Sequence, residues 1–169
     1  LYDRTWVCNG SENIGVSEVT CTDMETHGTL TYKEAMAHSC NIVFAKLAVE
    51  LGSDTMTKTA EKIGINSSFD VDGIKTAKGS YDVSDANENQ LGWSGVGQYN
   101  DKVNPMQMAI ICGAIANGGK ATNPTLIKDE SILSALGINY KSSGQELFSS
   151  DTATKLDDVM RYTVSDYDG

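Results

Sequence analysis

A helical pattern of apolar residues runs through Leu30–Gly52 and is broken once, at Ser39-Cys40-Asn41. Before the break, Thr31 and Glu34 form the Thr-x-x-Glu pattern of a capping box, which predicts that a first helix begins at Thr31. After the break, apolar residues recur at helical spacing, and Gly52 is typical of a helix end. A hydroxyl and a carboxamide two residues apart, at a junction between two helices, can both point into one cleft.

The same Ser39 and Asn41 also fit a simpler role. Serine and asparagine are favoured helix caps, and either residue could cap the second helix, which is expected to start near Ile42. A pattern of three residues is too short to separate capping from a binding role. On these residues alone, both interpretations stay open.

Charge and hydropathy exclude some classes of partner. Lys and Arg number 13 and Asp and Glu number 23, so the net charge is 13 − 23 = −10. An acidic chain without a basic run repels phosphate backbones, and we expect no nucleic-acid binding. No apolar stretch reaches the ~18–20 residues that a membrane helix needs, so we expect no membrane contact by this segment.

The length of 169 residues suits one domain, which the local signals divide into four segments. Residues 1–29 indicate an irregular or hairpin lead, and 30–64 indicate helices that carry Ser-x-Asn. Residues 65–104 are rich in Gly, Ser, Asn and Asp and are expected to form a long loop. Residues 105–169 indicate helices and a short strand, and Asn104, Pro105 and Gln107 together predict a capped helix start.

Four cysteines stand at positions 8, 21, 40 and 112. Cys8 and Cys21 could form a disulfide if the segment between them is a hairpin, or could be two buried thiols. Cys8 and Cys21 together with His27 and His38 are zinc-ligand types, but their spacing fits no common zinc motif. We therefore expect no metal and no cofactor, and we expect Cys40 to point into helix packing.

Two blocks of sequence resemble one known family. The first, HGTLTYKEAMAHSCNIVFAKLAVELG, resembles the region around the Ser-x-Asn motif of penicillin-binding protein transpeptidase domains. The second, GVGQYNDKVNPMQMAIICGAIANGGKATNPTLIK, is similar to the family's Gly-Gln loop, Pro-capped helix and strand lead. The blocks follow in the family's order. The resemblance implies an α+β fold, of which this chain would be a mostly helical lobe with an incomplete sheet.

The chain also departs from the family. The family's nucleophile lies in Ser-x-x-Lys and a further motif is Lys-Thr-Gly, and neither pattern occurs in this sequence. We therefore expect a partial transpeptidase domain that has no nucleophile of its own and is inactive alone.

What the resemblance implies for function concerns the parent protein. The parent would be a membrane-anchored, extracytoplasmic peptidoglycan D,D-transpeptidase. It would cross-link stem peptides ending in D-Ala-D-Ala through an acyl-serine intermediate, and β-lactams would acylate it. Ser39 would be its proton relay and Asn41 would bind the substrate.

Two other functions remain open from the sequence. One is a non-catalytic sensor or interaction domain on the same scaffold. The other is part of a serine β-lactamase, which needs a base that activates water for deacylation. Glu88-Asn89 is only a weak match to such a base.

Overall fold

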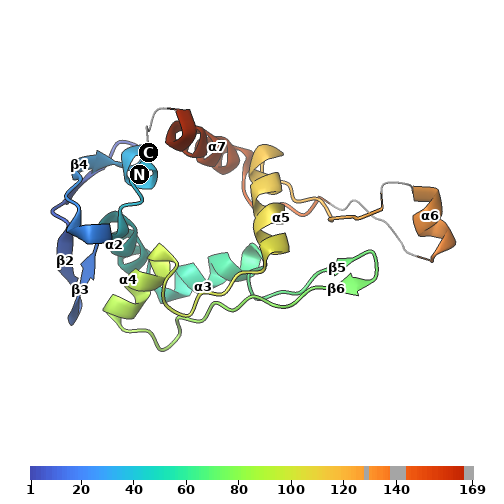
Figure 1. Ribbon diagram of the computed structural model, residues 1–169, viewed down its shortest axis with the longest axis horizontal. Coiled ribbons are helices and arrows are strands. Elements are labelled where there is room, and N and C mark those ends of the chain that lie inside the picture. Colours follow the sequence, from blue (N-terminus) through green and yellow to red (C-terminus); the bar gives the residue numbers. More distant parts are fainter. Residues whose placement is uncertain (128–129, 138–143, 166–169) are drawn as a thin grey trace. The chain divides into compact units, whose positions relative to one another are not determined.

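The computed structural model describes residues 1–127, 130–137 and 144–165 and contains helices and three two-stranded sheets among them (Figure 1). The chain forms two units. The first unit comprises Leu1–Thr59, Tyr81–Asp101 and Asp158–Gly169, and the second comprises Ala60–Ser80 and Lys102–Asp157.

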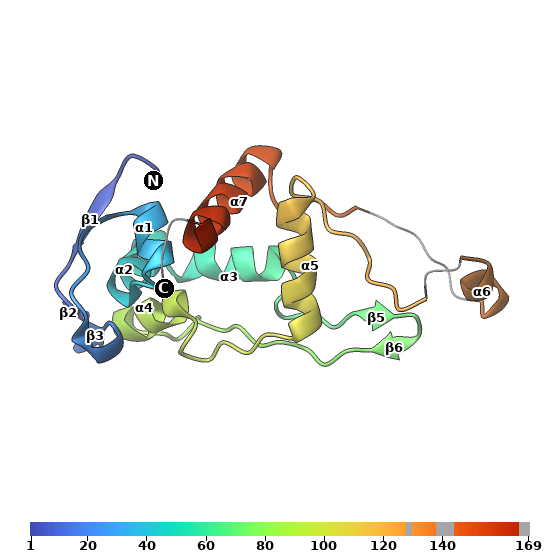
Figure 2. The same cartoon turned by 45° about the horizontal axis from the view of Figure 1, so that its top comes forward.

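The strands of the first unit form two antiparallel pairs. β1 (Thr5–Cys8) pairs with β4 (Gly28–Thr31), and Cys8 lies opposite Gly28. β2 (Ser11–Ile14) pairs with β3 (Ser17–Thr20) as a hairpin, and the short 3-10 helix η1 (Thr22–Met24) follows. The two pairs bring the end of β1 and the end of β3 toward the helices that follow β4 (Figure 2).

Helices α1 (Tyr32–Ala37) and α2 (Asn41–Leu51) begin and end close to where the sequence predicts. The Thr31 hydroxyl accepts the backbone N–H of Glu34, and the Glu34 carboxylate accepts the backbone N–H of Thr31, which confirms the capping box. Gly52 follows α2 with φ 80°, a conformation that favours glycine. α3 (Ser53–Lys62) comes next, and its residues from Ala60 on belong to the second unit.

Residues 88–96, which the sequence assigned to a long loop, form helix α4 (Glu88–Val96). Asn87 caps it, and Gln90 completes a second capping box. The Asn-x-x-Gln spacing was the signal that the sequence analysis missed. α4 lies beside α2 in both views (Figures 1 and 2).

Two apolar clusters form the core of the first unit. The larger cluster contains Trp6, Cys8, Cys21, Leu30, Ala35, Cys40, Ile42, Val43 and Leu47. The smaller contains Ile14, Val19 and Ala45, with Val49, Trp93 and Val96 packed against it. The apolar face of α2 contributes to both clusters, so this helix fixes the strands on one side and α4 on the other.

The second unit contains the hairpin of β5 (Asp70–Val71) and β6 (Ile74–Lys75), the helices α5 (Pro105–Ala116) and α6 (Glu130–Ala135), and the first half of α7 (Ser150–Ser165). Asn104 caps α5 by accepting the backbone N–H of Met106, and Pro105 stands at the first helical position.

Gln107 does not complete a capping box, so that part of the sequence prediction is wrong. Its side chain is 1% exposed, and its Nε2 donates a hydrogen bond to the backbone oxygen of Ile63. Because the Gln107 amide bonds to this carbonyl just after α3, it does not reach back to the start of α5. None of the described helices combines the length and the apolar character needed to cross a bilayer.

Candidate functional site

Ser39 occupies an unusual backbone position between α1 and α2. The backbone N–H of Cys40 donates to the oxygen of Ala35, and that of Ser39 donates to the oxygen of Met36. These two bonds form the Schellman ending of α1, in which the residue after the cap adopts the left-handed conformation and is usually glycine. Ser39 takes that position with φ 51°. A strained non-glycine residue of this kind is common at functional sites.

Ser39 and Asn41 line one hollow of about 300 Å³, as the sequence analysis expected. Its other walls are Met36, Phe44, Gly95 and Val96. Ser39 is exposed to the hollow, and Asn41 is half-buried. None of these six residues carries a charged side chain, so the described lining of this hollow includes no general base and no ammonium group.

Neither polar residue caps α2. The N-cap is Cys40, and it makes no side-chain capping bond. Within the described part of the chain, the Ser39 hydroxyl has no hydrogen-bond partner. The capping interpretation is therefore wrong, and the hydroxyl remains available to a group that enters the hollow.

Asn41 is held by a strand that lies 21 residues earlier in the sequence. Its Nδ2 donates a hydrogen bond of 2.8 Å to the backbone oxygen of Thr20, at the end of β3. A carboxamide has two N–H donors and one acceptor oxygen. The contact to Thr20 uses one donor and fixes the plane of the amide, which leaves a donor and an acceptor for another partner.

The wall formed by α4 depends on glycine. A Cβ at Gly95 would lie 2.4 Å from the Cβ of Ala48 and 2.8 Å from the backbone oxygen of Phe44. A Cβ at Gly92 would lie 3.3 Å from the Cβ of Ala45. The two glycines let α4 approach α2 closely, and this approach brings Gly95 and Val96 to the hollow.

Cys8 and Cys21 are both buried free thiols, with their Sγ atoms 3.7 Å apart. The hairpin of β2 and β3 does bring them together, as the disulfide hypothesis required. The side chains of Cys40 and His27 lie next to both sulfurs. His38, which the sequence analysis considered as a zinc ligand, is not part of this group. Cys40 is buried as expected, but its sulfur faces the other donors rather than only apolar packing.

Chemically, the hollow can exchange a proton through Ser39 and hold an amide through Asn41. It cannot by itself form an acyl-enzyme, because a serine hydroxyl needs a base to become a nucleophile. Within the described residues, no lysine, histidine or carboxylate lines the hollow.

Comparison with known proteins points to one family. The family model described as "Penicillin binding protein transpeptidase domain" matches residues 7–169. "Peptidoglycan D,D-transpeptidase PbpA" of Mycolicibacterium smegmatis is 31% identical over 101 residues, which are 59% of this chain and 20% of that protein. The protein of the same name from Mycobacterium tuberculosis H37Rv is 29% identical over 100 residues, again 59% and 20%. The chain thus spans about a fifth of the length of these curated relatives.

Solved structures share the fold. The D,D-transpeptidase domain of a peptidoglycan glycosyltransferase from Eggerthella lenta superposes with a TM-score of 0.79 at 25% identity, over 98% of this chain and 44% of that one. Penicillin-binding protein A of M. tuberculosis, as its penicillin G acyl-enzyme complex, gives a TM-score of 0.80 at 20% identity, over 97% and 39%. These similarities confirm the α+β fold that the sequence predicted, as a part of a larger domain.

Proposed function

Because the chain belongs to the penicillin-binding protein transpeptidase family, we propose that it forms part of a peptidoglycan D,D-transpeptidase and supplies one wall of its active-site cleft. The single observation that carries this proposal is that Ser39 and Asn41 line one hollow and that neither side chain caps α2. If the pair served only to cap helices, its side chains would bond to the backbone at the ends of α1 and α2, whereas Asn41 bonds to Thr20 of β3 instead.

In this reaction a serine outside the given sequence attacks the carbonyl of the D-Ala-D-Ala bond of a stem peptide. A tetrahedral intermediate forms, the C–N bond breaks, and the departing D-Ala amine takes up a proton. The amine of a second stem peptide then attacks the acyl-serine ester, which forms the cross-link and releases the serine. Splitting one acyl transfer in two lowers the barrier of each step.

Ser39 acts in the first step as the proton relay. A hydroxyl both donates and accepts a hydrogen bond. It can therefore take a proton from the nucleophile and its neighbouring lysine while it gives its own to the leaving amine. The absence of a partner for the Ser39 hydroxyl among the described residues supports this role, since a relay must be free to bond to both groups in turn.

Asn41 binds the substrate. The bond from its Nδ2 to Thr20 fixes the amide plane, so the remaining donor and acceptor keep one orientation when a peptide amide enters. Holding the reacting bond within reach of the nucleophile converts binding energy into rate. β-Lactams resemble the terminal dipeptide, and the same groups would hold them during acylation.

The reaction places the whole protein on the extracytoplasmic side of the bacterial membrane, where stem peptides are found. The acidic chain does not oppose this location, because its substrate is a peptide rather than a polyanion.

The test is the rate at which labelled penicillin acylates the whole protein that contains this chain. We expect Ser39→Ala and Asn41→Ala each to slow acylation about 10²–10³-fold, as losing one positioned hydrogen-bonding group typically does. Ser17→Ala, an exposed serine on β3, is the matched control and should acylate at the normal rate. Normal rates in both Ser39→Ala and Asn41→Ala would refute the assignment.

The 169-residue chain alone should not be labelled, because it has no nucleophile in a Ser-x-x-Lys pattern. Covalent labelling of the isolated chain would contradict this part of the proposal. Turnover of penicillin by the whole protein, instead of stable acylation, would indicate a β-lactamase.

A further inference from the structure

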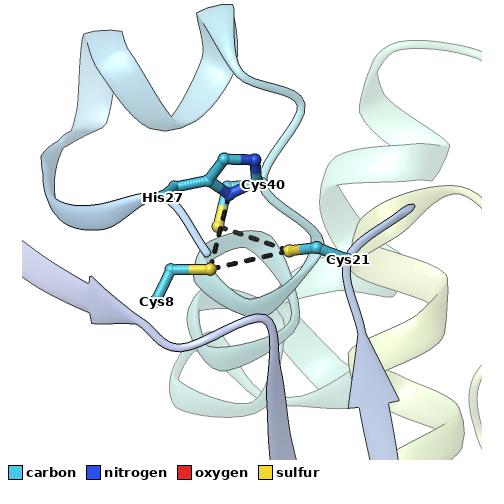
Figure 3. A group of neighbouring side chains, drawn as sticks. All are labelled: Cys8, Cys21, His27 and Cys40. Atoms are coloured by element: carbon cyan, nitrogen blue, oxygen red, sulfur yellow. Dashed lines mark hydrogen bonds between the residues drawn. The ribbon is translucent and has the colours of Figure 1, made fainter. Parts of the chain in front are cut away.

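Four potential metal ligands meet in the first unit, and each comes from the end of a different element (Figure 3). Cys8 ends β1, Cys21 follows β3, His27 precedes β4, and Cys40 precedes α2. We refer to these four residues as the cysteine–histidine cluster. Their donor atoms all lie within 4.8 Å of one another.

The separations match those of ligands around one tetrahedral ion. With Zn–S bonds of ~2.3 Å and a Zn–N bond of ~2.0 Å, a tetrahedron places two sulfurs about 3.8 Å apart and a sulfur and a nitrogen about 3.5 Å apart. The structure has 3.7 Å between the sulfurs of Cys8 and Cys21, and 3.9 Å between those of Cys21 and Cys40. The Cys8 sulfur lies 3.4 Å from Nδ1 of His27.

Burial of the cluster indicates a closed site. Cys8 and Cys40 are 0% exposed, Cys21 is 3% exposed, and the His27 side chain is 4% exposed. Structural zinc sites have four protein ligands and no open position, whereas catalytic sites keep one position for water. Three cysteines and one histidine supply all four positions here.

His27 has the outer partner that a metal-binding histidine usually has. Its Nδ1 faces the sulfurs, while its Nε2 lies 3.7 Å from a carboxylate oxygen of Glu25. A ligating imidazole typically turns its other N–H toward a carboxylate, which fixes the tautomer and the ring orientation. The ring of His27 is therefore oriented so that Nδ1 faces the three sulfurs and Nε2 faces Glu25.

We propose that Cys8, Cys21, His27 and Cys40 bind one zinc ion as a structural site. Three Zn–S bonds form as three thiol protons leave to solvent, and one Zn–N bond forms to the lone pair of Nδ1, with no change of oxidation state. The spacing of the four residues in the sequence, Cys-x12-Cys-x5-His-x12-Cys, matches no common zinc motif. The set that the sequence suggested contained His38 in place of Cys40, and its spacing likewise fits no common zinc motif, so no metal was expected.

The zinc ion would hold the turn that carries the candidate site. Cys40 lies between Ser39 and Asn41, and Cys21 follows Thr20, whose backbone oxygen accepts the hydrogen bond from Asn41. One ion bound to Cys21 and Cys40 therefore ties both ends of that hydrogen bond to the same centre. This positioning role rests on the proposed function, whereas zinc binding itself does not.

The first experiment measures zinc in the whole protein, purified without chelator, by mass spectrometry of the elements. We expect about one zinc per chain, as for a closed four-ligand site, and the same content in Cys112→Ser, whose cysteine is exposed on α5 outside the cluster. Cys8→Ser and Cys40→Ser should each lose most of the zinc. Equal zinc content in all four proteins would overturn the proposal.

Because a cysteine variant could fail to fold, X-ray absorption at the zinc edge of the unsubstituted protein gives an independent answer. Three sulfur ligands and one nitrogen ligand are expected. Coordination by oxygen and nitrogen only, or a peptide map of the unreduced protein with Cys8 linked to Cys21, would overturn the site.

Removal of zinc by a strong chelator separates this inference from the proposed function. Penicillin acylation should slow as zinc is lost and recover when zinc is returned. Acylation that is unchanged after complete zinc loss would refute the positioning role. Zinc-loaded protein that penicillin never acylates would refute the transpeptidase proposal and leave the metal site intact.

Discussion

Replacing Gly95 with alanine adds one methyl group where α4 approaches α2 most closely. The new Cβ would lie 2.4 Å from the Cβ of Ala48 and 2.8 Å from the backbone oxygen of Phe44. Carbon atoms in contact normally lie ~3.5–4.0 Å apart, so the two helices would have to separate locally by about 1 Å or more. The Phe44 oxygen is part of the α2 backbone and cannot rotate away.

The magnitude follows from two opposing effects. Overpacking by one methyl group typically costs ~1–3 kcal/mol, whereas alanine in place of glycine inside a helix gains ~0.8–1.0 kcal/mol. We expect the free energy of unfolding to fall by up to about 2 kcal/mol for Gly95→Ala, in place of the rise that the helix propensity of alanine alone would give. Penicillin acylation should also fall, because Gly95 lines the hollow beside Ser39.

Urea denaturation followed by tryptophan fluorescence measures this change, since Trp93 packs in the smaller core cluster beside α2. Gly113→Ala is the matched control. Gly113 lies inside α5, and a Cβ there would have nothing within 4 Å, so only the gain of ~0.8–1.0 kcal/mol should appear. If both variants were stabilised alike, the close packing of α4 on α2 would be refuted.

Three further changes test other parts of the structure. Ser39→Gly relieves the left-handed backbone at φ 51°, so the free energy of unfolding should rise by about 0.5–1 kcal/mol while penicillin acylation falls as in Ser39→Ala. A loss of stability in urea denaturation would argue against the Schellman ending of α1. Asn104→Ala removes the bonds to Met106 and Ala77 and should cost about 1–2 kcal/mol in the same assay. Asn104→Asp keeps the cap and should lose less, and equal losses would show that the cap contributes little. Burial raises the pKa of Asp101 to about 6, above the ~3.9 of an unfolded chain, so its ionised form destabilises the fold above pH 6 and that cost disappears as pH falls toward 4. At pH 7.5, urea denaturation of Asp101→Asn should therefore give a free energy of unfolding higher by up to about 1 kcal/mol, since the group is partly exposed. At pH 4 the variant should match the unsubstituted protein. A stability difference independent of pH would contradict this assignment.

Local signals placed most of the helix ends. The Thr31 and Glu34 box, Gly52 and the Asn104-Pro105 pair each act through bonds or backbone angles within a few residues, and the structure confirms them. The helix that the sequence did not predict, α4, also begins with a local signal. α4 has a capping box at Asn87 and Gln90, but its two glycines lower helix propensity, and only contact with α2 accounts for them.

The Ser-x-Asn pattern and its flanking blocks were sufficient to predict the family, and they also predicted that Ser39 and Asn41 would share one hollow. What the residues alone left open was whether those side chains cap α2. That outcome depends on Thr20, because a carbonyl at the end of β3 holds the Asn41 amide. The pairing of β2 with β3 sets the position of this carbonyl, and no local rule around Asn41 contains that information.

By itself, the sequence determined where α1, α2 and α5 start and which polar residues stand at the junction of α1 and α2. The tertiary structure alone decided that Cys8, Cys21, His27 and Cys40 converge. The physical reason is the separation along the sequence of the residues that interact. Helix caps and turns are closed by hydrogen bonds across a few residues, whereas the cluster joins the ends of four elements whose approach is fixed by strand register and by the burial of the α2 apolar face.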